Sequence, residues 1–416
     1  MQRSLAYALS PAPGLPLRFL LAAPWFGVLA ALALFAAGER AFASRWSAGV
    51  LGSTHLLTLG YLGMAMAGSM LQLIPVVTGA AVPVSRAAAA TAWGGLALGA
   101  LLLACALGLG ASFLFLPAAL LLACAFAVLL VVIGRALWRP ATAPAMPMVR
   151  GMRLALAGLA VTVSLGVTLA FALSGALATP VPMLADLHAG WGLLGWVAML
   201  VVGVAFQVIP MFQSSKLYPA QVTRWAPWLL FSLLAAWSGG APYAGALLAA
   251  ALVAFAAFTA WLLTTRKRKE PDATTRYWRL SLGSLAASAL LFFLPPSAQA
   301  PLALGVVFIG GFAMGAVNGM LYKIVPFLLW YHLQSDPHAT KGQVPTIRLI
   351  LPDALARRQF YWHALALAAL LGAVYWPGYL VRPACALLAV SSLLLATDLW
   401  RAANSCRKIK AIFQPS

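Results

Sequence analysis

Twelve long apolar segments with almost no charged residues follow one another along this 416-residue chain. A helix needs about 20 apolar residues to cross the roughly 30 Å of hydrocarbon in a bilayer. Only 8% of the residues are charged, against about 25% in soluble domains. We therefore expect one all-α integral membrane domain over residues 1–416, with twelve transmembrane helices. The predicted spans are 17–38, 49–77, 88–110, 112–134, 152–176, 184–212, 225–241, 243–265, 278–295, 302–331, 360–380 and 383–400.

The formal net charge of +20 would suit a nucleic-acid partner, but its distribution indicates a membrane partner. If the N-terminus is cytoplasmic, 23 of the 27 Lys and Arg residues fall on the cytoplasmic side. Arg40, Arg45 and Arg382 fall on the opposite side, and Lys323 lies within a span. Membrane proteins carry such an excess of basic residues in their cytoplasmic loops. We predict a multi-pass protein of a bacterial inner membrane with both termini cytoplasmic. Its basic loops would contact anionic lipids, and we expect no nucleic-acid partner.

Three of the predicted helices share one sequence frame, Gly-(x7)-Gly-(x3)-polar-(x2)-Pro. The first copy has Gly60, Gly68, Gln72 and Pro75; the second has Gly195, Gly203, Gln207 and Pro210; the third has Gly311, Gly319, Lys323 and Pro326. The helix before each copy opens with an arginine, at Arg18, Arg153 and Arg279. This self-similarity predicts three quasi-repeats of four helices, approximately 1–140, 141–270 and 271–416. All three run in the same orientation, so their symmetry axis should stand along the membrane normal.

The frame has two interpretations. The paired glycines permit close approach by a neighbouring helix or a flat ligand, and the proline kinks the helix end. On the first interpretation the frame serves packing, and the Lys323 ammonium reaches the membrane interface. On the second, Gln72, Gln207 and Lys323 form a polar pathway or a headgroup site, because polar groups inside membranes are commonly functional.

Two histidines lie at similar depth on symmetry-related helices. His55 and His188 stand 20 and 22 residues before their repeat prolines, near the predicted periplasmic face. One interpretation is that each histidine only forms hydrogen bonds at the interface; the other is a metal ligand, because neutral imidazole is the common ligand of haem iron and copper. Asp186 is a candidate for orienting a neighbouring imidazole. Asp398 is interpreted as a helix-end residue that faces water.

The segments His55 to Gly60 and Gly68 to Pro75, within twelve helices in three repeats, resemble haem-copper oxidase subunit I. The resemblance is greatest to the cytochrome cbb oxidase and nitric oxide reductase branch. Together with Pro16-Leu-Arg-Phe-Leu, the same segment is similar to NnrS-type proteins, twelve-helix relatives implicated in nitric-oxide metabolism and described as binding haem and copper. The resemblance implies an oxidase-like scaffold that holds a b-type haem, or copper, through His55 and His188.

The departures from the family pattern concern its metal ligands. The tenth helix has no histidine before His332, which is at the wrong membrane face, and the seventh lacks the histidine pair that binds copper. His188 is shifted by two residues from the family's copper ligand, which turns it through about 200° on a helix. NnrS-type proteins usually carry several histidines near the position of His55, where this chain has one. An oxygen- or NO-reducing centre therefore cannot be assembled from this chain alone.

We accordingly expect a respiratory or nitric-oxide-linked accessory or electron-transfer protein, and not a terminal oxidase by itself. Its partner would be a respiratory complex or a c-type cytochrome. Two alternatives stay open. One is a membrane carrier or assembly factor for a metal, haem or a small anion, and the other is a scaffold subunit without a cofactor.

Overall fold

The structure, a computed structural model, describes residues 10–267, 270–293, 295, 297–336 and 344–413, and it contains helices but no strand in these ranges. The first half comprises α1 (Gly14–Ala37), η2 (Gly38–Ala43), α2 (Ala48–His55), η3 (Leu56–Gly63), α3 (Met64–Thr78), α4 (Arg86–Leu109), η4 (Ser112–Leu114), α5 (Phe115–Leu137), η5 (Ala143–Ala145), α6 (Met146–Leu173), α7 (Val181–Gly190), η6 (Trp191–Ala198) and α8 (Met199–Gln213). The second half comprises α9 (Ala220–Ser238), α10 (Ala244–Thr264), α11 (Ala273–Leu291), α12 (Ala300–Gly305), η7 (Val306–Ala313), α13 (Met314–Gln334), α14 (Ile347–Ile350), α15 (Asp353–Tyr375) and α16 (Pro377–Phe413).

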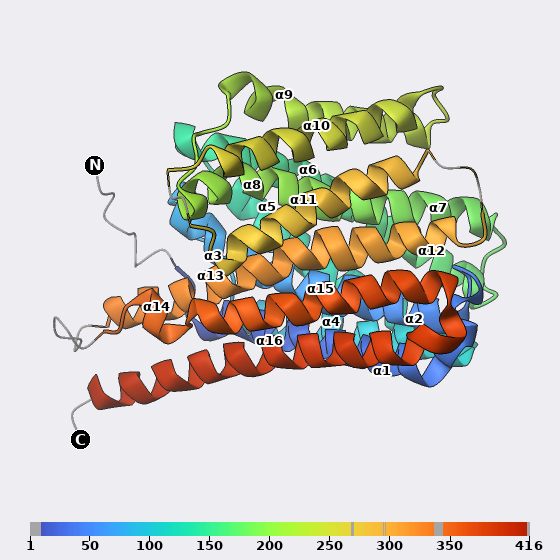
Figure 1. Cartoon of the computed structure of the whole chain (residues 1–416), viewed down its shortest axis with the longest axis horizontal. Helices are drawn as coiled ribbons and strands as arrows, with labels where there is room; N and C mark the ends of the chain where they lie inside the picture. The colour runs from blue at the N-terminus through green and yellow to red at the C-terminus, as the bar shows by residue number, and fades with distance from the viewer. Residues whose placement is uncertain (1–9, 268–269, 294, 296, 337–343, 414–416) are drawn as a thin grey trace.

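The long helices run side by side in one bundle, and α1 begins and α16 ends at the same end of it (Figure 1). Nine helical segments of the described chain are long and apolar enough to cross a membrane. The prediction of an all-helical, multi-pass membrane protein is thereby confirmed. Helices also occupy the other three predicted spans, as α9, α11 and α15. These three are more polar; α11, for example, carries Arg276 and Arg279.

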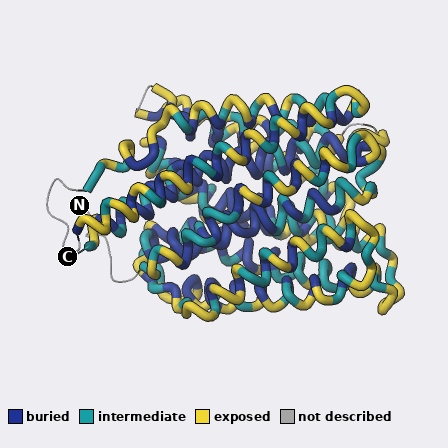
Figure 2. The backbone as a smooth tube through the Cα atoms, turned by 90° about the horizontal axis from the view of Figure 1, so that it is seen from below, coloured by how far each residue is buried: buried dark blue, intermediate teal, exposed yellow. Residues whose placement is uncertain are grey.

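The three helices that carry the frame form the centre of the bundle. Each is continuous through α2–η3–α3, α7–η6–α8 or α12–η7–α13, and these are the three most buried of the nine apolar segments. The outer helices turn exposed residues away from this centre (Figure 2). The frame prolines lie inside α3, α8 and α13, toward one end of the bundle, which we call the proline end. His55 and His188 lie toward the other, the histidine end.

Each central helix contains a π-helical segment of eight residues: Leu56–Gly63, Trp191–Ala198 and Val306–Ala313. π-helix is rare in proteins and is frequent at functional sites. All three segments begin about 20 residues before the frame proline. The helices that share a sequence frame therefore also share an unusual backbone at the same place.

The second frame glycine packs the same way in all three helices. A Cβ atom at Gly68 would lie 2.9 Å from Phe19 and Leu20 of α1. One at Gly203 would lie 2.8 Å from the Cα of Gly151 in α6, and one at Gly319 would lie 2.7 Å from Tyr277 of α11. The helices α1, α6 and α11 are those that the sequence places at the start of the three blocks. The glycines thus bring a neighbouring helix close, which is the first of the two uses predicted for them.

Candidate functional site

His55 and His188, the two candidate ligands, lie beside each other. His55 is the last residue of α2, directly before the π-helical segment η3. His188 lies in α7, three residues before the π-helical segment η6 begins at Trp191. Their ring centroids are 6.2 Å apart and their ring planes differ by 14°. The third central helix has Leu304 and Val306 at the corresponding positions, and it adds no ligand there.

Both imidazoles are held through Nδ1 by a backbone carbonyl. The Nδ1 atom of His55 is 2.8 Å from the oxygen of Leu51, and that of His188 is 3.0 Å from the oxygen of Thr162 in α6. A carbonyl oxygen only accepts hydrogen bonds, so each Nδ1 carries the proton in the neutral ring. The lone pair is then on Nε2, the state in which a second hydrogen bond orients a metal-binding imidazole.

The two stacked rings offer two neutral imidazole nitrogens from two different central helices within one small region of the bundle. Imidazole nitrogen is a common ligand of haem iron and of copper. The residues present therefore fit either metal by the chemistry of their donor atoms.

Helix α6 leaves little room behind the His188 ring. A Cβ atom at Gly166 would lie 2.9 Å from Cε1 of His188. The absence of a side chain at Gly166 therefore permits the ring to lie against α6, where Thr162 receives its hydrogen bond. Neither Gly166 nor Thr162 belongs to the shared frame, and no pattern in the sequence singled them out.

Asp186, predicted as a partner for an imidazole, instead pairs with Arg45. The two side chains are 2.6 Å apart and about half exposed. This ion pair ties α7 to the segment before α2, and so it links the two chain segments that carry the histidines. Backbone carbonyls take the orienting role that was expected of the carboxylate.

The three residues of the predicted polar pathway have different surroundings. Gln72 is buried, and neither its amide nitrogen nor its amide oxygen has a hydrogen-bond partner. It lines a cavity of about 10 Å³ with Leu73, Val76, Met211, Phe212, Ile324 and Phe327. Gln207 is partly buried, and neither it nor Lys323 is among the residues that line this cavity.

Lys323 forms an ion pair with Asp272, whereas one of the two interpretations of the frame expected its ammonium to reach the membrane interface. Its Nζ lies 2.9 Å from Oδ2 of Asp272, the N-cap residue of α11. The other oxygen of Asp272 accepts hydrogen bonds from the backbone N–H and the hydroxyl of Thr275, both 2.9 Å away. Burial raises the pKa of Asp272, but the Lys323 ammonium and the Thr275 hydrogen bonds outweigh it and lower the pKa overall.

A polar cluster in the bundle was missed by the sequence analysis. Asp398 is fully buried, and the prediction that it faces water is wrong. Helix α16 continues to Phe413, so Asp398 lies within the helix and packs toward α13. Its oxygens accept hydrogen bonds from Tyr322 at 3.0 Å and Arg358 at 3.1 Å. A carboxylate within an apolar run is the signal that could have identified it, because such groups are normally paired.

Two further buried tyrosines extend this cluster across the bundle. Tyr61, in the π-helical segment η3, donates a hydrogen bond to the side chain of Asn318. Tyr277 donates to the side chain of Gln359, whose amide nitrogen donates to the hydroxyl of Ser391 at 2.9 Å. The first bond joins the first central helix to α13, and the other two join α11, α15 and α16.

Comparison with known proteins adds no relative: no family model matches the chain, and no curated protein matches it.

Proposed function

We propose that this chain is a twelve-span membrane protein related to haem-copper oxidase subunit I and that His55 and His188 together bind one metal, haem b iron or copper. The observation that carries the proposal is the pairing of these two rings, 6.2 Å apart, each with Nδ1 hydrogen-bonded to a backbone carbonyl. The shared frame, the three matched π-helical segments and the resemblance of residues 55–75 support the oxidase-like scaffold.

Residues of the chain would fix the ligands in place. The carbonyls of Leu51 and Thr162 hold each imidazole in the tautomer that presents Nε2, and Gly166 lets the His188 ring lie close to α6. A bound haem iron or copper ion would supply one-electron redox chemistry. With two histidines in place of a full oxidase ligand set, the chain would transfer electrons or assist a respiratory or nitric-oxide-linked complex.

The proposed orientation puts the histidine end at the periplasmic face of a bacterial inner membrane and both termini in the cytoplasm. The basic loops would then contact anionic lipid at the proline end. A c-type cytochrome or a respiratory complex would meet the protein at the histidine end, which carries the proposed metal site.

The test is a reduced-minus-oxidised spectrum and metal analysis of the protein purified in detergent. A Soret band or copper bound to imidazole nitrogen is expected, and both His55→Ala and His188→Ala should remove that signal. His363→Gln is the matched control, because His363 is also a buried intramembrane histidine that bonds to a carbonyl, that of Gly310, at 3.0 Å. A colourless wild-type protein that contains no copper would refute the metal site and favour a scaffold without a cofactor.

A carrier for a metal, haem or a small anion is the second candidate, and the unpartnered amide of Gln72 favours it. A buried amide without a hydrogen-bond partner costs about 1–3 kcal/mol. Its presence at this place would be explained if the amide formed hydrogen bonds to a solute that passes through the protein. Uptake into proteoliposomes by Gln72→Leu and Lys323→Met, compared with wild type, tests this function. Unchanged flux in both variants would exclude these residues from a pathway.

A further inference from the structure

A cavity of about 60 Å³ lies where the three central helices α3, α8 and α13 meet. Equivalent residues of the three helices line it. They are Ala65, Leu200 and Ala316, ten residues before each frame proline; Met66, Val201 and Val317, nine before; and Ser69, Val204 and Met320, six before. The cavity therefore lies on the axis that would relate the three repeats, away from the histidine pair.

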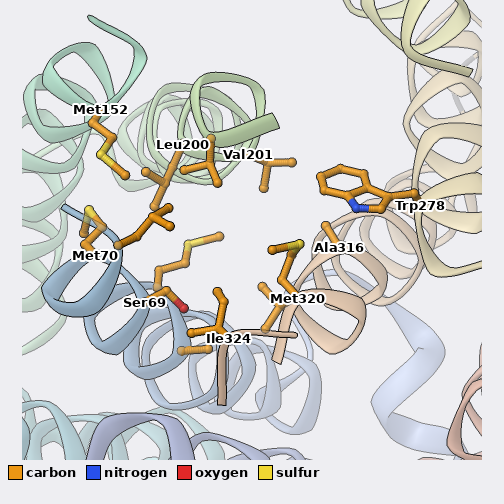
Figure 3. Close-up of a pocket in the computed structure, with 14 residues that line it drawn as sticks. Ser69, Met70, Met152, Leu200, Val201, Trp278, Ala316, Met320 and Ile324 are labelled. Atoms are coloured by element: carbon orange, nitrogen blue, oxygen red, sulfur yellow. The ribbon is translucent and has the colours of Figure 1, made fainter. Parts of the chain in front are cut away.

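Four methionines surround this axial cavity. Met66 and Met70 come from one face of α3, Met320 comes from α13, and Met152 comes from α6. All four are buried, with at most 8% of their surface exposed. Figure 3 shows Met70, Met152 and Met320 arranged around the cavity, with Trp278 and Ser69 also at its wall. Three different helices thus contribute thioether side chains to the lining of one cavity.

We propose that the axial cavity is a binding site for a soft monovalent metal ion, Cu(I), with these thioethers as ligands. Thioether sulfur selects Cu(I), whereas carboxylate, carbonyl and water oxygens suit magnesium, calcium and manganese. Among the residues that line the cavity only Ser69 offers a side-chain oxygen. A hard cation would find no compensation there for its lost hydration, which is expensive inside a membrane.

Packing alone does not account for this arrangement. Methionine is flexible and normally fills irregular gaps in a core, and protein interiors contain few voids larger than a water molecule. Here four flexible side chains surround a gap that none of them fills. The same flexibility would allow the sulfur atoms to converge on a small ion.

A second, smaller cavity adjoins this site toward the proline end. The two cavities share Leu73 and Ile324 as lining residues, and Gln72 is also among the residues that line the second one. Gln72 is 2% exposed, and its side-chain amide has no hydrogen-bond partner.

The test measures Cu(I) binding to the whole protein in detergent, with Cu(I) buffered anaerobically by a chromophoric chelator. It uses the His55→Ala/His188→Ala background, so that copper at the histidine pair does not contribute. One Cu(I) per chain with a sulfur shell in the X-ray absorption spectrum is expected. Combined replacement of Met66, Met70, Met152 and Met320 by Leu should weaken Cu(I) binding by at least roughly 10–100-fold. Loss of a residue that only supports a metal ligand already has that effect, and these four side chains would be ligands themselves.

Met64→Leu is the matched control, since Met64 is fully buried on the same helix but does not line the cavity. The axial site is refuted if the four-leucine protein binds Cu(I) as tightly as its parent. It is also refuted if the parent's spectrum shows no sulfur neighbour, a result that does not depend on how well the variant folds. Loss of all copper from His55→Ala/His188→Ala alone would refute this inference and leave the proposed histidine site standing.

Discussion

The hydroxyl of Tyr322 in α13 donates a hydrogen bond to Oδ2 of Asp398 in α16, at 3.0 Å and out of reach of solvent. The guanidinium of Arg358 in α15 holds the other oxygen of the same carboxylate at 3.1 Å. One buried carboxylate therefore joins three helices, and its removal would leave the buried Tyr322 hydroxyl without an acceptor.

We predict that Asp398→Leu destabilises the protein, because an unsatisfied buried donor costs about 1–3 kcal/mol. Thermal unfolding in detergent, followed by circular dichroism, should show a clearly lower midpoint. Arg357→Gln serves as the control: its pair with Asp353 spans 3.8 Å and is about half exposed, so its loss should cost only about 0–1 kcal/mol. Equal midpoints for Asp398→Leu and wild type would contradict the assigned role.

The packing of His188 against Gly166 predicts a change at the metal site without loss of a ligand. In Gly166→Ala the new methyl group would press on Cε1 of His188, which lies 2.9 Å from the added atom. We expect a shifted visible spectrum or a reduced metal content. Gly134→Ala, in α5, is the matched control because nothing lies within 4 Å of an added Cβ there. A wild-type spectrum and metal content in Gly166→Ala would argue against this position of the ring.

The contact between α6 and α8 should tolerate no side chain. A Cβ atom at Gly151 would approach the Cα of Gly203 to 2.4 Å. Gly151→Ala should therefore force the helices apart and cost about 1–3 kcal/mol, as overpacking usually does. Gly283→Ala, an open position in α11, should be neutral or slightly stabilising. The yield of monodisperse protein and the unfolding midpoint measure both, and similar values for the two variants would contradict the contact.

The ion pair of Asp272 with Lys323 predicts an acid-sensitive contribution to stability. The pKa of Asp272 is lower in the folded protein than its ordinary value of 3.8. Its stabilisation is therefore fully present above that value and is lost as the pH falls through the folded-state pKa. Unfolding midpoints between pH 6 and 3 should fall less steeply for Asp272→Asn than for wild type. Parallel pH profiles would mean that other carboxylates account for the acid sensitivity.

The sequence by itself determined the class of protein and the places of its helices. Lipid accepts only backbones whose polar groups are satisfied internally, so long uncharged runs favour membrane-spanning helices, and nine helical segments of the described chain are long and apolar enough for that. Composition and spacing also singled out His55, His188 and Gln72, because polar residues are few in such a chain.

Only the tertiary structure decided what those side chains meet. A π-helical segment closes i→i+5 hydrogen bonds, so it rotates the residues on either side of it relative to an α-helix. The facing direction of His55, His188 and Tyr61 therefore did not follow from residue counts. The two rings of the pair, the Thr162 carbonyl that orients His188 and the partners of Asp398 and Lys323 come from segments far apart in the sequence. Hydropathy measures how apolar a segment is, whereas these contacts depend on which faces of different helices pack together.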